Sequence, residues 1–133
     1  MTAANPAFTA RTNGARQPAS APVLRIPGSL SLVLPAHNEA ENIRQVVNRA
    51  LAVLPTYTET FEIIVVNDGS RDTTGAIIDE MAATEPRVRP VHHPRNLGYG
   101  AALTSGFTAS TGDYVMFMDA DRQFDIGDLR LLA

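Results

Sequence analysis

The stretch LSLVLP, residues 30–35, sets the architecture that we predict for this chain. A short apolar run closed by a proline has the length and composition of a strand buried on both faces, as strands of parallel sheets are. Apolar residues then recur at helical spacing from Ile43 to Leu54, and Pro55 follows them. A buried strand followed by an amphipathic helix is the first half of a βαβ unit.

The same alternation continues along the chain. Residues 114–118, YVMFM, form an uninterrupted apolar run, which predicts another strand buried on both faces. The small residues of 97–106 predict a helix that lies close to its neighbours. Further strands are predicted at 61–66 and 88–92, and further helices at 73–83 and 125–132. Because parallel strands need helical crossovers, we predict a three-layer α/β/α fold with a mainly parallel sheet.

Composition excludes several classes of protein. The chain has 133 residues, 44% of them apolar, and no cysteine, so disulfides and thiolate metal sites are excluded. All eleven basic residues are arginine, and the formal net charge is −3. Three of the arginines fall in the first 27 residues, so the rest of the chain is acidic and does not have the charge of a general nucleic-acid binder.

Two regions are expected from the distribution of residues. Residues 1–28 are rich in Pro, Ala, Ser and Thr without periodicity, which predicts a disordered tail, and residues 29–133 form the folded domain. The sequence has neither the apolar core of a secretory signal nor the run of about 18 apolar residues that a membrane span needs. We expect a cytoplasmic location, either free or peripheral at the cytoplasmic face of a membrane.

Polar residues follow the predicted strands at their carboxyl ends, where parallel sheets bind ligands. If strand order reverses beside residues 30–35, the carboxylates become neighbours and repel one another unless a cation approaches. Mg²⁺ or Mn²⁺ prefers such oxygens and often completes its shell with phosphates, which indicates a nucleotide diphosphate. The residues concerned are Pro35, His37 and Glu39 after the first strand, Asp68 after the second, and Asp119 and Asp121 after the fourth.

Other interpretations of single motifs remain open at this point. With eight aspartates in the chain, an Asp-x-Asp arises by chance at about even odds, and an Asp-rich turn explains the pair at 119–121 without a metal. Gly98-Tyr99-Gly100 resembles a dinucleotide fingerprint, but Leu103 stands where its third small residue belongs. His92 and His93 are adjacent on a strand, so they point to opposite faces and cannot easily share a metal.

Four motifs in order give the chain a family resemblance. They are LVLPAHNEAENI at 32–43, IVVNDGSRDTT at 64–74, RNLGYGAA at 95–102 and MDADRQ at 118–123. Together they resemble the family 2 glycosyltransferases, and within them the polyprenyl-phosphate (dolichyl-phosphate-type) mannosyl- and glucosyltransferases. The resemblance implies a GT-A fold and an enzyme that transfers a hexose, with inversion, from a nucleotide-diphospho-sugar of the GDP-mannose or UDP-glucose type. The implied acceptor is polyprenyl phosphate at a membrane.

The resemblance also implies roles for individual residues. Asp119 and Asp121 would be the catalytic DxD pair around Mg²⁺ or Mn²⁺. Asp68 would accept a hydrogen bond from the base or the ribose. The remaining nucleotide-binding positions would be Pro35, His37 and Glu39 in the nucleotide pocket, Ala120 beside the ribose, and Gln123 as a further metal or phosphate contact.

Two features depart from the family pattern. Asn67 stands where the family often has Asp, and His37 stands where it often has Tyr or a small residue. Members of the family also continue for about as long again with acceptor-binding elements, so the chain is expected to be truncated at its C-terminus. The alternative function is therefore a catalytically inactive module that binds nucleotide-sugar and metal.

Overall fold

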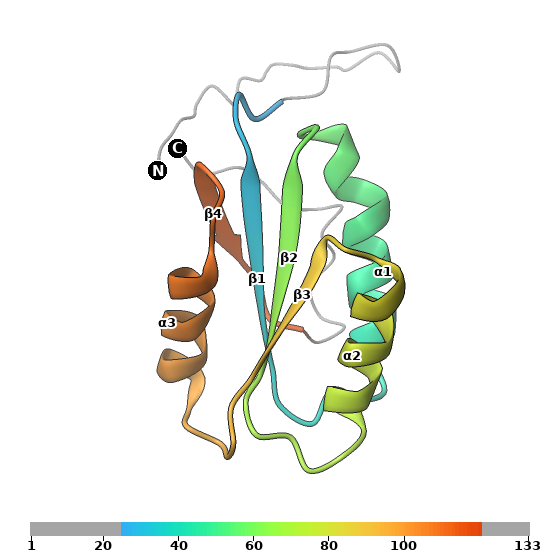
Figure 1. The fold of residues 1–133 in the computed structure, drawn as a ribbon, viewed down its shortest axis with the longest axis vertical. Helices are drawn as coiled ribbons and strands as arrows, with labels where there is room; N and C mark the ends of the chain where they lie inside the picture. Colours follow the sequence, from blue (N-terminus) through green and yellow to red (C-terminus); the bar gives the residue numbers. More distant parts are fainter. Residues whose placement is uncertain (1–24, 121–133) are drawn as a thin grey trace, which may run out of the picture.

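The computed structural model describes residues 25–120, which form a sheet with helices on both faces (Figure 1). The strands are β1 (Leu30–Ala36), β2 (Phe61–Asn67), β3 (Val88–His92) and β4 (Tyr114–Phe117). The helices are α1 (Ile43–Val53), α2 (Thr74–Thr84) and α3 (Tyr99–Ala109), and a 3-10 turn, η1 (Leu54–Thr56), follows α1. This is the element order that the sequence predicts.

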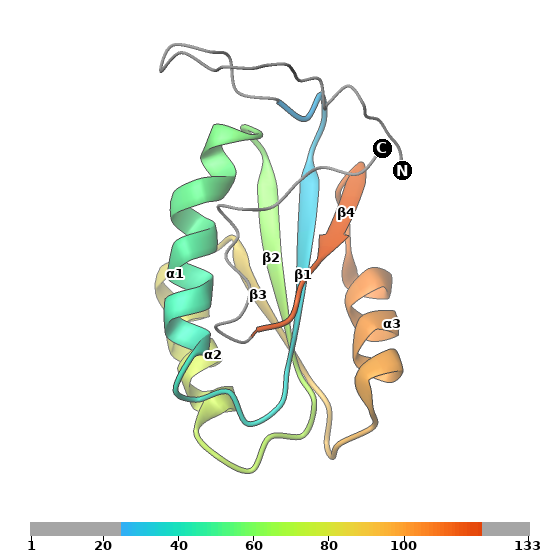
Figure 2. The same ribbon diagram turned by 180° about the vertical axis from the view of Figure 1, so that it is seen from behind.

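The strand order in the sheet is β3-β2-β1-β4, and every neighbouring pair is parallel. Figures 1 and 2 show α1 and α2 on one face of the sheet and α3 on the other. The three-layer α/β prediction is confirmed. Since β2 and β4 flank β1 on opposite sides, strand order reverses beside β1, which is where sheets of this kind bind ligands.

The alternation of side chains along β1 divides the core into two layers. Leu32 and Leu34 pack in the large cluster beneath α1 and α2, whereas Val33 packs in a smaller cluster with Ala102 of α3. Gly106 of α3 lies so close to the sheet that a Cβ there would overlap the side chain of Val33. The close approach predicted from the small residues of this helix is confirmed.

The prediction that the fourth strand is buried on both faces was wrong. Val115 and Phe117 are 42% and 50% exposed, while Met116 packs against the cluster beneath α1 and α2. The reason is that α3 lies over β1 and β2 and reaches β4 mainly through an edge-to-face contact of Phe107 with Phe117, with ring centroids 5.9 Å apart. One face of β4 is therefore left partly uncovered.

Helix starts differ slightly from the predicted positions. Asn42 is the N-cap of α1, and the residues before it form turns. Thr73 is the N-cap of α2, although its side chain makes no capping hydrogen bond. Asp72 still contributes, since its Oδ1 accepts the Thr74 amide at 2.9 Å.

The folded domain includes the end of the predicted tail. Ile26 is buried in the core and its amide donates to the Tyr57 carbonyl at 2.7 Å, and the Gly28 carbonyl accepts from Thr58. The rest of that tail and the helix predicted at 125–132 lie outside the described residues. Within residues 25–120, no helix has both the length and the apolar character to cross a membrane.

Candidate functional site

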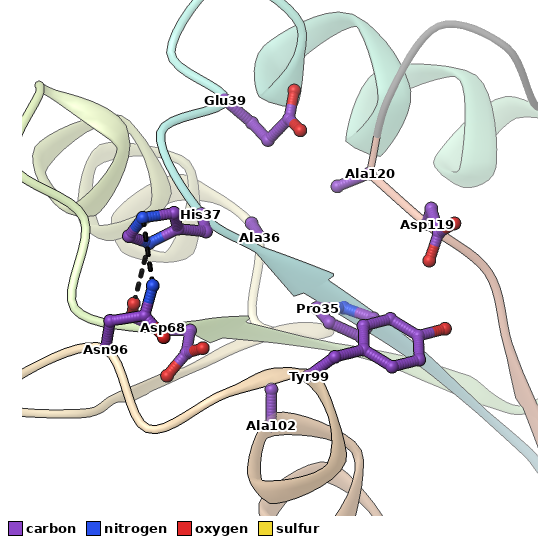
Figure 3. Close-up of a pocket in the computed structure, with 10 residues that line it drawn as sticks. All are labelled: Pro35, Ala36, His37, Glu39, Asp68, Asn96, Tyr99, Ala102, Asp119 and Ala120. Carbon is purple, nitrogen blue, oxygen red and sulfur yellow. Dashed lines mark hydrogen bonds between the residues drawn. The ribbon is translucent and has the colours of Figure 1, made fainter.

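A cavity of about 290 Å³ opens at the carboxyl edge of the sheet, where β1 and β4 part (Figure 3). It lies at the reversal of strand order, as predicted from the strand ends. Six of the eight predicted site residues line it, and the other two, Asp121 and Gln123, lie outside the described residues. The lining is formed by Pro35, Ala36, His37, Glu39, Asp68, Asn96, Tyr99, Ala102, Asp119 and Ala120.

Pro35 lies within β1, and its position explains why the cavity opens there. The register of β1 with β4 ends at the pair Val33–Phe117, and the Val33 carbonyl then accepts the amide of Met118. Pro35, two residues on, faces the same side and has no N–H to offer. The chain after β4 is therefore free to leave the edge of β1, and the resulting gap becomes the cavity.

The loop after β1 is tied to the loop after β2. Asn38 adopts a positive φ of 55° and bridges the two, because its amide donates to Ser70 Oγ at 2.9 Å and its Oδ1 accepts the Arg71 amide at 2.8 Å. The Glu39 amide donates to Thr74 Oγ1 at 2.9 Å. These bonds hold the carboxylate of Glu39 at the rim of the cavity (Figure 3).

His37 is held by hydrogen bonds on both ring nitrogens. Nδ1 lies 2.8 Å from the Asp68 carbonyl, which only accepts, so Nδ1 carries the proton. Nε2 then accepts from the side-chain amide of Asn96, at 3.1 Å (Figure 3), and from that of Asn38, at 3.2 Å. The imidazole thus joins three loops at the cavity rim in one orientation.

Asp68 is a buried carboxylate with most of its acceptor capacity filled. Oδ1 accepts the Leu97 amide and His93 Nδ1, each at 2.8 Å, and Oδ2 accepts the Gly98 amide at 3.0 Å. Burial raises the pKa of Asp68, but these hydrogen bonds outweigh burial and hold the pKa below its ordinary value. The carboxylate is ionised, and Oδ2 keeps one acceptor position toward the cavity.

Asp119 lies on the side of the cavity opposite His37 and Asp68, near the phenol of Tyr99 (Figure 3). Partial burial raises the pKa of Tyr99, and hydrogen bonding to Asp119 together with the charge of that carboxylate raises it further. Ala120, the next residue, is buried and also lines the cavity. Asp119 thus brings its side-chain carboxyl group to the cavity from the chain that leaves β4.

The structure adds residues that sequence reasoning missed. Asn96, from the connection between β3 and α3, and Tyr99, the first residue of α3, line the cavity together with Ala36 of β1 and Ala102 of α3. The motif RNLGYGAA at 95–102 contained a signal for them, but its glycines were interpreted and its polar side chains were not. His92 and His93 do point to opposite faces: His92 contacts Asp79 of α2, and His93 contacts Ser105 of α3.

The donor set suits a hard divalent cation. Glu39 and Asp119 bring carboxylate oxygens to the same cavity, and such oxygens are the ligands that Mg²⁺ and Mn²⁺ prefer. Within residues 25–120 no group of three candidate ligands comes together. Asp121, the second residue of the predicted metal pair, falls outside that range, so its position relative to Asp119 stays a prediction.

A parallel sheet with a polar cavity at its switch point is typical of α/β domains that bind a ligand there, and here the arrangement is that of the GT-A fold. The chain belongs to glycosyl transferase family 2, whose sequence profile matches residues 31–133. The resemblance seen in the four motifs is thereby confirmed.

Individual relatives agree with the family assignment. The chain is 37% identical over 120 residues to glycosyltransferase AglD of Haloferax volcanii, covering 89% of this chain and 19% of that protein. It is 38% identical over 96 residues to dolichyl-phosphate beta-glucosyltransferase ALG5C of Trichomonas vaginalis, covering 68% and 28%. The chain therefore spans less than a third of the length of these two relatives.

A solved structure has the same fold. The mannosyltransferase PcManGT of Pyrobaculum calidifontis, in complex with GDP-Man and Mn²⁺, superimposes with a TM-score of 0.65 at 25% identity. The alignment covers 75% of this chain and 29% of that one. The similarity again concerns one part of a longer protein.

Proposed function

We propose that the cavity at the carboxyl edge binds a nucleotide-diphospho-sugar of the GDP-mannose or UDP-glucose type. The observation that carries this proposal is the convergence of Pro35, His37, Glu39, Asp68, Asp119 and Ala120, from three separate strand ends, on one cavity. The GDP-Man complex of PcManGT, a protein of the same fold, supports the choice of ligand class. A cavity of about 290 Å³ is near the lower end of the usual range for small-ligand sites.

Under this proposal, the contacts of the side chains that line the cavity indicate how each would bind the nucleotide. Asp68 Oδ2 retains one acceptor position for an N–H or O–H of the base or ribose. His37, fixed on both nitrogens, and Pro35 form a rigid wall for the nucleotide. Ala120 leaves space for the ribose because its side chain is a single methyl group.

Asp119 and Asp121 would hold Mg²⁺ or Mn²⁺, with Gln123 as a further contact to metal or phosphate. When bound, the ion would neutralise negative charge on the departing diphosphate. The Mn²⁺ in the PcManGT complex supports a divalent metal. Glu39 at the rim adds negative charge that a cation offsets.

The acceptor that we propose is polyprenyl phosphate at a membrane surface, with inversion at the anomeric carbon. The name of the Trichomonas relative, a dolichyl-phosphate glucosyltransferase, supports this acceptor class. A phosphate acceptor is already ionised near neutral pH, so its attack needs less help from a general base than attack by a hydroxyl group.

Thermal unfolding with Mn²⁺ and either GDP or UDP tests donor binding. At a nucleotide concentration of about 100 times Kd, the free energy of unfolding should rise by about 2.7 kcal/mol. Asp119→Asn and Asp121→Asn should remove most of that gain, whereas Glu59→Gln, which changes a carboxylate that is 91% exposed and does not line the cavity, should keep it. An equal gain in all variants would contradict the metal assignment.

A transfer assay separates the two functions that the sequence left open. Radiolabelled sugar-nucleotide, Mn²⁺ and polyprenyl phosphate in detergent should yield labelled lipid with an active transferase. Nucleotide binding without labelled lipid would instead favour the alternative, a donor-binding module that transfers nothing.

A further inference from the structure

Behind the cavity, Asp68 is one end of a chain of three side chains that runs into α3. His93 follows β3 directly, and its Nδ1 lies 2.8 Å from Asp68 Oδ1. Its Nε2 lies 2.7 Å from Ser105 Oγ. The Asp68 and His93 side chains are only 6% and 8% exposed, so water competes little for these bonds.

The ionised state of Asp68 determines the direction of its hydrogen bond with His93. A carboxylate only accepts, so His93 Nδ1 carries the proton and donates it to Asp68. Nε2 lies within hydrogen-bond distance of the Ser105 hydroxyl, which can either donate to a bare Nε2 or accept from an Nε2–H. Ser105 fixes the rotation of the imidazole, and the imidazole fixes the carboxylate.

The order Asp-His-Ser is also that of a hydrolytic triad, but the location favours another role. A nucleophile must meet substrate, and Ser105 does not line the cavity. It lies partly buried in the middle of α3, with His93 between it and Asp68. The three residues therefore serve to orient Asp68.

The orientation of Asp68 determines the shape of one wall of the cavity. Its two oxygens capture the amides of Leu97 and Gly98, at 2.8 and 3.0 Å, and so hold the turn that begins α3. This turn carries Asn96, whose amide contacts His37 at 3.1 Å, and Tyr99, which lies beside Asp119. A rotated carboxylate would release the wall formed by Asn96 and Tyr99.

We infer that His93 is a positioning residue for the donor site: backed by Ser105, it orients Asp68 so that the carboxylate fixes the wall formed by Asn96 and Tyr99. This inference rests on the proposed function, because it concerns the same cavity. It gives the main role to the Nδ1–H that donates to Asp68 and a secondary role to the contact of Nε2 with Ser105.

Two substitutions of His93 separate the two ring nitrogens. In His93→Asn the side-chain amide lies near the former Nδ1 and can still donate to Asp68, whereas in His93→Gln the longer side chain reaches toward the former Nε2 and Ser105. Affinity for Mn²⁺ with GDP or UDP, measured by calorimetry, should stay within about twofold in His93→Asn and fall by about tenfold in His93→Gln. Ser105→Ala should weaken binding by less than His93→Gln.

Hydrogen exchange in the free protein provides the readout that does not depend on nucleotide. The Leu97 and Gly98 amides should stay protected in His93→Asn and lose protection in His93→Gln, while global stability falls similarly in both. Equal protection in the two variants would overturn the inference. Failure of the wild-type chain to bind either nucleotide would instead contradict the proposed function, and the exchange comparison would still decide the role of His93.

Discussion

The second strand, β2, has a partly buried carboxylate, Glu62, near its amino end and a buried one, Asp68, just past its carboxyl end, and the two ends behave differently. At the amino end, Glu62 accepts hydrogen bonds from Ser31, Thr111 and Arg89. At the carboxyl end, Asp68 accepts from His93 and from two backbone amides of the turn before α3. For both groups burial raises the pKa, and the hydrogen bonds outweigh it, so both pKa values lie below their ordinary values.

The difference lies in what surrounds the carboxylates. At the amino end β4 is paired with β1 from Leu30–Tyr114 onward, and Thr111 closes over Glu62. At the carboxyl end β4 has left β1, and Asp68 lines a cavity. A buried, hydrogen-bonded carboxylate therefore indicates a binding site only where strand pairing stops and leaves an opening.

Gly69→Ala should have the largest effect on the free energy of unfolding, and it tests the structure at the carboxyl end of β2. Gly69 has a φ of 65°, and a Cβ there would overlap the backbone of Arg95 and Asn96, which cannot move aside like a side chain. We expect a loss of about 3 kcal/mol in the free energy of unfolding, from left-handed strain and overlap together. Urea denaturation measures it.

Gly100→Ala is the matched control for that substitution. Gly100 lies in α3, and a Cβ there would meet nothing within 4 Å, so stability should rise by about 0.5–1 kcal/mol. A loss at Gly100 as large as that at Gly69 would show that the overlap is not the cause.

Glu62→Gln should separate stability from binding. The amide keeps the shape but loses the charge that three neighbours stabilise, so the free energy of unfolding should fall by about 2 kcal/mol. Nucleotide affinity should be unchanged, since Glu62 does not line the cavity. Asp68→Asn, measured in parallel by denaturation and calorimetry, should lower both quantities. Loss of nucleotide affinity in Glu62→Gln would contradict the prediction that the amino end of β2 contributes to stability and not to binding.

Acidification should have the smallest effect on the free energy of unfolding, and it tests the contribution of Glu62 at the amino end of β2. Because the folded pKa of Glu62 lies below its ordinary value of 4.5, its contribution is complete above that pH and is lost as pH falls through the folded pKa. Each such group changes stability by at most about 1.4 kcal/mol per pH unit. Urea titrations between pH 7 and pH 3 should show a shallower decline in Glu62→Gln than in the exposed control Glu59→Gln.

Much of the fold could be predicted because short-range patterns determine it. Residues 88–92 form β3 with the predicted bounds, although Pro90 interrupts the run, because the edge position of β3 tolerates a proline. The partial exposure of Val115 and Phe117 could not be predicted. An apolar run predicts a strand with at least one buried face. How much of the other face a neighbouring helix covers depends on where that helix lies.

The candidate site was predictable where strand ends determine it. Glu39, Asp68 and Asp119 each follow a strand, and parallel pairing brings such positions to one edge. Asn96 and Tyr99 were missed because they lie on a turn held by Asp68, a contact between residues about 30 positions apart. No local pattern reports that contact.

The sequence by itself determined the strand–helix order, the parallel sheet and the family, because hydrophobic period and contiguous motifs are local properties. Only the tertiary structure decided that β4 leaves β1 beside Pro35 and that His93 contacts Asp68 from behind the cavity. It also decided that Thr111 closes over Glu62 at the amino end of β2. These features depend on distances between residues far apart in the chain. Packing sets those distances, and the order of residues alone does not.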